Sequence, residues 1–251
     1  MRAQFVPTQN AKEFLAKLKA LDQRGANEAC LLVTEGDPGL GKTTTTQWWA
    51  VQSGAPFVRA KEEWTPTWFL RDLLAELRVT PEHSFERMFR QAVQGLAKYA
   101  TDAQRDGRPA GVVIDEADHI SRNKRMMETV RDLSDMLEIP FILVGMGKVR
   151  ANLTRYPMIA RRVGQYAEFK PMPLSDAEAM VKTLCEVEVK PCLVEFMHRA
   201  AGGKSSEIKE GIAAIERFGK RNAGTAIGVA EMAGQMLFND RSTGLPILVR
   251  G

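Results

Sequence analysis

The stretch Gly36-Asp37-Pro38-Gly39-Leu40-Gly41-Lys42-Thr43 matches the pattern GxxxxGK[ST], and it decides the fold of this chain. An apolar run, Cys30–Thr34, precedes it, and a helical pattern, Thr43–Ser53, follows it. Glycines let backbone N–H groups converge on phosphate oxygens, and the start of a helix adds a favourable dipole. We therefore expect a phosphate-binding loop between a strand and a helix. The alternative is a glycine-rich turn without a ligand.

A second motif follows, where the apolar run Val112–Ile114 ends in Asp115 and Glu116. In a triphosphate site Lys42 would contact the β- and γ-phosphates, the Thr43 hydroxyl would bind Mg²⁺, and Asp115 would hold that ion through water. Glu116 is placed to polarise an attacking water, which a hydrolase needs and a kinase does not. The alternative is a strand that ends in a solvated acidic turn. The two motifs together predict nucleoside triphosphate hydrolysis. The expected nucleotide-binding residues are Gly36, Asp37, Pro38, Gly39, Leu40, Gly41, Lys42, Thr43, Thr44 and Asp115.

Short apolar runs alternate with helical patterns as far as residue 172, which indicates an α/β domain around a buried parallel sheet. The runs are Cys30–Thr34, Pro56–Val58, Gly111–Asp115, Phe141–Gly145 and Ala167–Phe169. We expect residues 1–172 to form this domain, with an N-terminal helix over Asn10–Leu21. Residues 173–238 show helical patterns, the last over Thr225–Leu237, and predict a second, helical domain. Residues 239–251 are expected to be an irregular tail or a short extended arm.

Composition excludes several classes of protein. Of 251 residues, 44% are hydrophobic and 26% are charged, which is an ordinary globular balance. No apolar run is long enough to span a membrane, and three cysteines without CxxC spacing predict neither a disulfide framework nor a zinc site. We expect a cytoplasmic protein. The net charge of +4 permits a nucleic-acid partner but does not argue for one by itself.

The phosphate loop, the acidic strand, the short strands and the helical end together resemble the AAA+ ATPases. The resemblance implies a base with a five-stranded parallel sheet, a small all-helical lid, and ATP with Mg²⁺ as cofactors. Within these ATPases, residues 8–235 look most like the transposition-regulator group that includes the phage Mu B protein and TnsC. The segment Tyr156–Val163 is similar to the stretch that carries the family's arginine finger.

A finger arginine acts on a neighbouring subunit, so the resemblance implies a homo-oligomer. Arg162 is our first choice for the finger, Arg161 the second and Arg155 the third; the alternative is that they cap a helix or face solvent. Two departures from the family pattern predict slow hydrolysis. Gly145-Met146-Gly147 offers no polar sensor side chain after its strand, and Ser206 stands near the usual sensor arginine of the lid, where Lys204 or Lys209 would be imperfect substitutes.

Three short basic clusters are candidates for contacts with DNA phosphates. They are Arg59 with Lys61, then Arg122, Lys124 and Arg125, then Lys148 with Arg150. Each could instead be a solvated helix start. In an oligomer, weak contacts from each subunit would add along the duplex without reading its sequence.

The function we expect is an ATP-dependent DNA-binding protein that assembles as a filament or ring on duplex DNA. The resemblance implies that it delivers target DNA to a transposase, with slow hydrolysis as the disassembly switch. One alternative is a helicase loader or replication initiator. The other is a nucleotide-gated signalling or scaffold module that does not bind DNA.

Overall fold

The computed structural model describes residues 1–222 and 224–250, and its internal contacts divide the chain into two compact units. The α/β unit comprises Glu13–Asp37 and Lys42–Phe169, and the C-terminal unit comprises Met1–Lys12, Pro38–Gly41 and the chain from Lys170 onward. The expected boundary after residue 172 therefore falls close to Lys170. The first twelve residues and the tip of the glycine loop group with the C-terminal unit, whereas we had expected them in the first domain.

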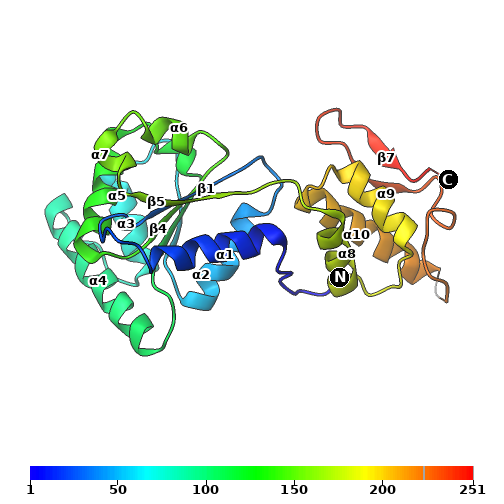
Figure 1. The fold of residues 1–251 in the computed structure, drawn as a ribbon, viewed down its shortest axis with the longest axis horizontal. Coiled ribbons are helices and arrows are strands. Elements are labelled where there is room, and N and C mark those ends of the chain that lie inside the picture. Colours follow the sequence, from blue (N-terminus) through cyan, green and yellow to red (C-terminus); the bar gives the residue numbers. More distant parts are fainter. Residues whose placement is uncertain (223, 251) are drawn as a thin grey trace. The chain divides into compact units, whose positions relative to one another are not determined.

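The α/β unit contains a five-stranded sheet in the order β2-β3-β4-β1-β5, and every pair of neighbouring strands is parallel (Figure 1). The strands are β1 (Leu31–Glu35), β2 (Phe57–Arg59), β3 (Val112–Asp115), β4 (Phe141–Val144) and β5 (Val163–Glu168). The helical elements are α1 (Gln9–Leu21), α2 (Lys42–Ser53), α3 (Pro66–Glu76), α4 (Phe85–Arg105), η1 (Ala117–His119), α5 (Lys124–Leu137), α6 (Val149–Leu153) and α7 (Pro157–Ala160). The predicted five-stranded parallel sheet is confirmed.

The helices cover both faces of the sheet. Every residue of β3 and β4 is buried, which explains why these strands read as continuous apolar runs rather than alternating ones. Helices α3, α4 and α5 pack with Leu31, Val33 and other strand residues in one core (Figure 1). On the opposite face, Phe14 of α1 meets Trp49 of α2 edge to face, with ring centroids 6.4 Å apart.

The C-terminal unit has its own core, formed by α8 (Leu174–Leu184), α9 (Pro191–Ala201) and α10 (Ser205–Arg221). The helix expected over Thr225–Leu237 does not form. Gly224 and Gly234 have positive φ angles of 104° and 76°, which interrupt helical backbone. The tail is not irregular throughout its described residues: β6 (Met236–Asn239) and β7 (Pro246–Leu248) form an antiparallel hairpin. Gly251 of that predicted tail lies outside the described residues.

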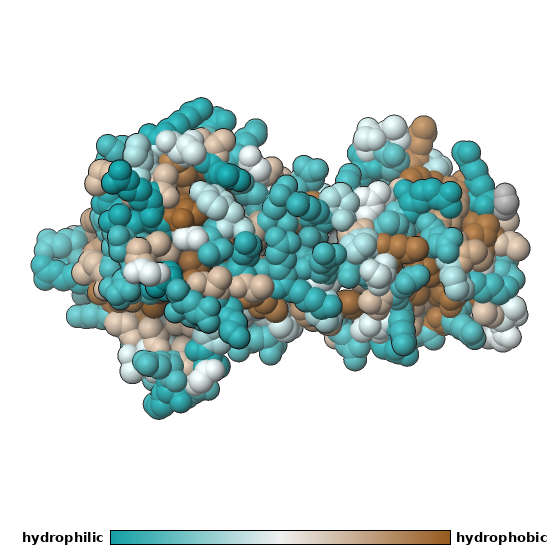
Figure 2. All heavy atoms as spheres, in the orientation of Figure 1, coloured by the Kyte–Doolittle hydropathy of each residue, from teal (hydrophilic) through white to brown (hydrophobic). Residues whose placement is uncertain are grey.

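Surface hydropathy gives no broad apolar face in the view of Figure 2, where hydrophilic side chains surround small hydrophobic patches. Some large apolar side chains are nevertheless exposed, among them Met158 and Leu245. Isolated exposed apolar residues are normal on globular proteins. The exposed apolar residues therefore give no evidence of a binding surface.

Candidate active site

Lys42 is the first residue of α2, directly after the glycine loop, and it is 7% exposed. Its ammonium donates to the carbonyl oxygens of Gly36 at 2.7 Å and Asp37 at 2.8 Å. Burial lowers the pKa of the Lys42 ammonium, and nearby carboxylates oppose that shift. In order of decreasing effect these carboxylates are Asp115, Asp118, Asp37 and Glu116. A buried cation held by two carbonyl groups is a suitable partner for a phosphate.

The loop backbone requires glycine for two reasons: one position has no room for a Cβ atom, and two others have positive φ angles. A Cβ at Gly36 would lie 2.4 Å from the carbonyl oxygen of Phe169, so no other side chain fits without a shift of backbone. Gly39 and Gly41 have φ angles of 85° and 91°, which L side chains rarely adopt. In the C-terminal unit, the Gly39 carbonyl accepts a hydrogen bond from the Ser206 N–H at 3.1 Å.

Two residues that we expected to hold a metal ion lie in contact. The Thr43 hydroxyl is 3.1 and 3.3 Å from the two carboxylate oxygens of Asp115, which is only 2% exposed. Hydroxyl and carboxylate oxygens suit Mg²⁺, which is usually bound by one or two carboxylates together with substrate phosphates and water. Among the described residues no group of three or more His, Cys, Asp and Glu could hold a metal by itself. The donor set therefore fits Mg²⁺ that arrives with a phosphate ligand.

Glu116 follows β3 in the left-handed region, with φ 57°, which is uncommon for a residue other than glycine. Its backbone N–H donates to the Asp115 carboxylate at 3.0 Å. Its own carboxylate is half-buried and makes no hydrogen bond or ion pair within the described residues. Its expected role in orienting a water stays a prediction.

Arg59 ends β2 directly opposite Asp115 of β3 in the sheet register. Its guanidinium lies 3.5 Å from the Asp115 carboxylate, while 61% of its side chain remains exposed. Sequence reasoning placed Arg59 only among the DNA candidates. The only available signal for this contact was that both residues end neighbouring strands.

The ammonium group of Lys61, the other member of the first basic cluster, contacts side chains of its own unit. Its ammonium pairs with Asp72 and lies 5.5 Å from the ring centroid of Trp64 and 5.0 Å from that of Trp68. The Lys61 side chain is still 49% exposed. The faces of the two aromatic rings attract the ammonium electrostatically and so restrict the position of the Lys61 side chain.

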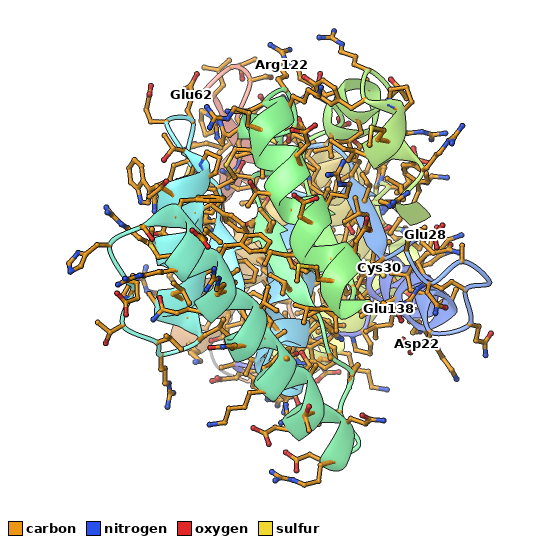
Figure 3. The ribbon with its side chains drawn as sticks, turned by 90° about the vertical axis from the view of Figure 1, so that its left-hand side faces the viewer. Asp22, Glu28, Cys30, Glu62, Arg122 and Glu138 are labelled. Atoms are coloured by element: carbon orange, nitrogen blue, oxygen red, sulfur yellow. The ribbon has the colours of Figure 1, made fainter. Side chains whose placement is uncertain are left out.

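The second basic cluster lies at the start of α5. Lys124 pairs with Glu128 at 3.7 Å, whereas the Arg122 and Arg125 side chains form no ion pair within the described residues. Arg125 lines a surface hollow of about 610 Å³. Figure 3 shows Arg122 at the N-terminal end of α5 and Glu138 at the other end.

The third basic cluster lies at the start of α6. The Arg150 guanidinium stacks over the Tyr166 ring at 4.6 Å, and its backbone N–H donates to Glu35 at 2.8 Å. The Lys148 side chain has no ion-pair partner within the described residues. The three clusters thus occupy three separate elements.

The three arginines that were candidates for the finger differ in their contacts. The Arg162 Nε is 3.0 Å from both carboxylate oxygens of Asp135, and Nη2 is 3.0 Å from one of them. These hydrogen bonds with Asp135 raise the pKa of the Arg162 guanidinium. Arg161 and Arg155 are exposed and make no ion pair within the described residues. Arg162, our first choice for the finger, is therefore bound inside its own subunit, and Arg161 is not.

Asp118 is a residue that sequence reasoning missed. Its carboxylate accepts hydrogen bonds from the backbone N–H groups of Met146 and Lys148. A Cβ at Gly145 would lie 2.6 Å from the Asp118 carboxylate and 2.4 Å from Val149. The place where a polar sensor was expected is thus filled from another element. The signal was the third carboxylate in Asp115-Glu116-Ala117-Asp118.

Comparison with known families settles the class of this chain. The sequence pattern of the AAA domain matches residues 24–153, which is just over half of the 251-residue chain. The chain belongs to the AAA domain family. The matched residues of this AAA protein include the glycine loop, the acidic strand and Asp118. A search among curated proteins gave no match.

Solved structures similar to this AAA protein share its fold at low sequence identity. The ORC1 protein of Aeropyrum pernix in complex with DNA has a TM-score of 0.57 and 14% identity, covering 88% of this chain and 62% of its own. The ORC2 protein of the same organism, in ADPNP–ADP complexes, has a TM-score of 0.63 and 12% identity, with coverage of 92% and 68%. A point mutant of Thermotoga maritima RuvB has a TM-score of 0.56 and 20% identity, with coverage of 90% and 68%.

These similarities establish the AAA+ fold with its P-loop, and this chain spans about two thirds or less of the length of these structures. None of the helices in the described part of the chain combines the length and apolar character needed to cross a membrane.

Proposed function

We propose that this AAA protein binds ATP with Mg²⁺, hydrolyses it slowly, and assembles on duplex DNA in its ATP-bound state. The observation that carries the proposal is the arrangement around Lys42. Its buried ammonium, the contact between Thr43 and Asp115, and the unpaired Glu116 carboxylate provide a phosphate partner, a metal site and a group that orients water. Similarity to an ORC2 protein in ADPNP–ADP complexes supports the nucleotide class.

Hydrolysis requires, in this proposal, an arginine from a neighbouring subunit. Arg161 is the better candidate because it is exposed and makes no ion pair in the described part of the chain, whereas Arg162 would have to leave Asp135. Breaking a charge-assisted pair of three short contacts opposes that movement. The proposed active site is therefore completed by Arg161 in a homo-oligomer.

Arg59 supplies a route by which DNA would affect hydrolysis. It reaches Asp115 while most of its side chain stays exposed. A DNA phosphate that attracts the Arg59 guanidinium would withdraw it from Asp115 and leave this carboxylate to Mg²⁺. The other basic clusters, at the starts of α5 and α6, would add contacts with the phosphate backbone.

The partner that we propose is a transposase, to which the DNA-bound assembly delivers its target, with hydrolysis leading to disassembly. The support for this narrower placement is the layout of the motifs in the sequence and the similarity of Tyr156–Val163 to the stretch that carries the family's arginine finger. A second candidate is a replication initiator or helicase loader. The fold similarity to an ORC1 protein in complex with DNA favours this alternative.

A binding experiment tests the proposal. Duplex and single-stranded DNA of equal length are titrated with the protein at low salt, with a non-hydrolysable ATP analogue, with ADP and without nucleotide. We expect duplex binding that requires the ATP analogue and weakens steeply with salt, because phosphate contacts release counterions. Electron microscopy of the same samples should show filaments or rings.

Lys42→Ala should abolish nucleotide binding and assembly, and Lys98→Ala, an exposed change on α4, is the matched control. A preference for single strands would favour the helicase loader. Absence of all DNA binding at low salt would leave the signalling or scaffold module as the remaining function.

A further inference from the structure

The segment that carries Arg161 is fastened along its length to the segment that follows the acidic strand. At its start, the backbone N–H groups of Met146 and Lys148 bind the Asp118 carboxylate. At its end, Arg162 binds Asp135. Two further contacts lie between these ends, and together they connect residues 118–135 with residues 146–162 inside the α/β unit.

One of these contacts is a buried polar pair. The Asn152 side chain donates to the Ser121 hydroxyl at 2.8 Å, and this hydroxyl donates to the Asp118 carbonyl at 3.2 Å. Ser121 is 0% exposed and Asn152 is 4% exposed. Buried polar groups are costly unless they are paired, so this pair specifies one alignment of α6 against the segment that follows η1.

The other contact lies one turn farther along the segment. The Tyr156 hydroxyl donates to the Arg122 carbonyl at 2.6 Å, just before α7 begins at Pro157. Arg122 lies at the N-terminal end of α5 (Figure 3). Arg161 follows α7 directly, so its backbone position depends on these attachments.

Asp118 is the member of this network closest to the chemistry. It lies two residues after Glu116, and its charge acts on the Lys42 ammonium more strongly than that of Asp37 or Glu116. Each of its carboxylate oxygens accepts one backbone N–H of the turn after β4. The same carboxylate fills the space beside Gly145. Asp118 therefore binds the turn after β4 directly and acts on Lys42 through its charge.

We propose that Asp118, together with the Ser121–Asn152 pair, is a positioning group that holds Arg161 in place for the neighbouring subunit. The inference rests on the proposed function, because it needs an oligomer in which Arg161 acts across the interface. It adds a direction to that function: within one subunit, Asp118 sets the position of the Arg161 that this subunit offers to the next. Loss of Asp118 should then harm hydrolysis in the neighbour.

Mixed oligomers test this direction. Glu116→Gln subunits cannot hydrolyse but keep Arg161, and Arg161→Ala subunits lack the arginine but keep Glu116. Mixing the two should restore ATP hydrolysis at interfaces where the first donates its arginine to the second. Asp118→Ala is then placed either in the arginine donor or in the hydrolysing subunit, and the recovered rate is measured at saturating ATP.

We expect Asp118→Ala in the donor to lower the recovered rate by about 10- to 100-fold, the effect of a misplacement of about 1 Å. The same change in the hydrolysing subunit should have a smaller effect. A general loss of structure would lower the rate in both placements, so the asymmetry separates positioning from folding. The double variant Ser121→Ala/Asn152→Leu, which removes both buried partners together, should show the same asymmetry even if Asp118→Ala unfolds.

The outcomes are distinguishable. If the parent mixture recovers hydrolysis and neither changed donor lowers it, the positioning role is wrong while the oligomeric ATPase stands. If the parent mixture recovers nothing although both variants bind ATP, the assignment of Arg161 is wrong and this inference falls with it. If Asp118→Ala lowers the recovered rate equally in the arginine donor and in the hydrolysing subunit, the proposal that Asp118 acts on the neighbouring subunit is also wrong.

Discussion

Arg161 and Arg162 are neighbours in the sequence, but the structure predicts opposite consequences for their removal. Arg161→Ala should abolish most ATP hydrolysis and leave the protein as stable as before. Arg162→Ala should lower stability, and because it loosens the backbone next to Arg161 it should lower hydrolysis by no more than about 10- to 100-fold, far less than Arg161→Ala. The difference arises because only Arg162 is bound to Asp135 within its own subunit.

The magnitude for Arg162 follows from its contacts. Three nitrogen–oxygen distances of 3.0 Å join it to Asp135, and both side chains are 27% exposed. Hydrogen bonds to charged groups contribute about 1.5–3 kcal/mol when buried, and partial solvent exposure reduces this to about 1–2 kcal/mol for the pair. For a unit of this size, such a loss lowers Tm by about 2–8 °C.

The magnitude for Arg161 follows from its proposed role. A finger arginine is worth about 10³–10⁵ in kcat, so Arg161→Ala should lower DNA-stimulated hydrolysis by at least about 10³. Its effect on the free energy of unfolding should stay within about 0.5 kcal/mol, as for other exposed surface residues. ATP affinity should be unchanged.

The assay combines steady-state ATP hydrolysis with thermal and urea unfolding of both variants, and Lys98→Ala on α4 serves as the exposed control. Asp135→Ala should reproduce the stability loss of Arg162→Ala. The reasoning would be refuted if Arg162→Ala lost hydrolysis a thousandfold with unchanged stability while Arg161→Ala remained active.

Three further predictions concern the loop, the DNA route and the C-terminal unit. Gly36→Ala should abolish ATP binding in a calorimetric titration, because its Cβ would lie 2.4 Å from a backbone carbonyl oxygen; retained affinity would contradict this loop geometry. Arg59→Gln should raise hydrolysis without DNA and reduce its stimulation by DNA, since Asp115 loses the competing guanidinium; an unchanged ratio of the two rates would argue against the route. Burial raises the pKa of Glu216, but hydrogen bonds including one from Lys220 outweigh it and hold the pKa at about 2, below the ordinary 4.5. Its contribution to stability is thus present above pH 4.5 and is lost as the pH falls toward 2, and Glu216→Gln should flatten acid unfolding over that range.

Much of the fold follows from local patterns in the sequence. The apolar runs of β3 and β4 have no alternation because helices cover both faces of the sheet, and the glycine loop joins a strand to a helix as its pattern requires. The secondary structure after residue 224 could not be predicted from local patterns. The apolar residues of Thr225–Leu237 fit a helical period, but the backbone is interrupted by glycines and continues into β6, whose partner β7 lies beyond a turn.

The candidate site was predictable where its residues belong to motifs that are recognisable in the sequence and lie at the carboxyl edge of one parallel sheet. Lys42 and Thr43 begin α2, and Asp115 ends β3, so their approach follows from the topology of the sheet. The contacts of Arg59, Asp118 and Arg162 could not be predicted. Each depends on which side chain reaches across from another element, and basic or acidic residues alone do not reveal that.

The sequence by itself determined the phosphate loop, the acidic strand and hence the AAA family, because these motifs encode their geometry within a few residues. Only the tertiary structure decided which arginine is free and which carboxylate fills the place of the missing sensor. Arg162 is neutralised by Asp135, and Asp118 occupies the space beside Gly145, through packing between segments far apart along the chain. Two adjacent arginines that look equivalent in the sequence therefore have different surroundings, because Asp135 of α5 lies beside one of them.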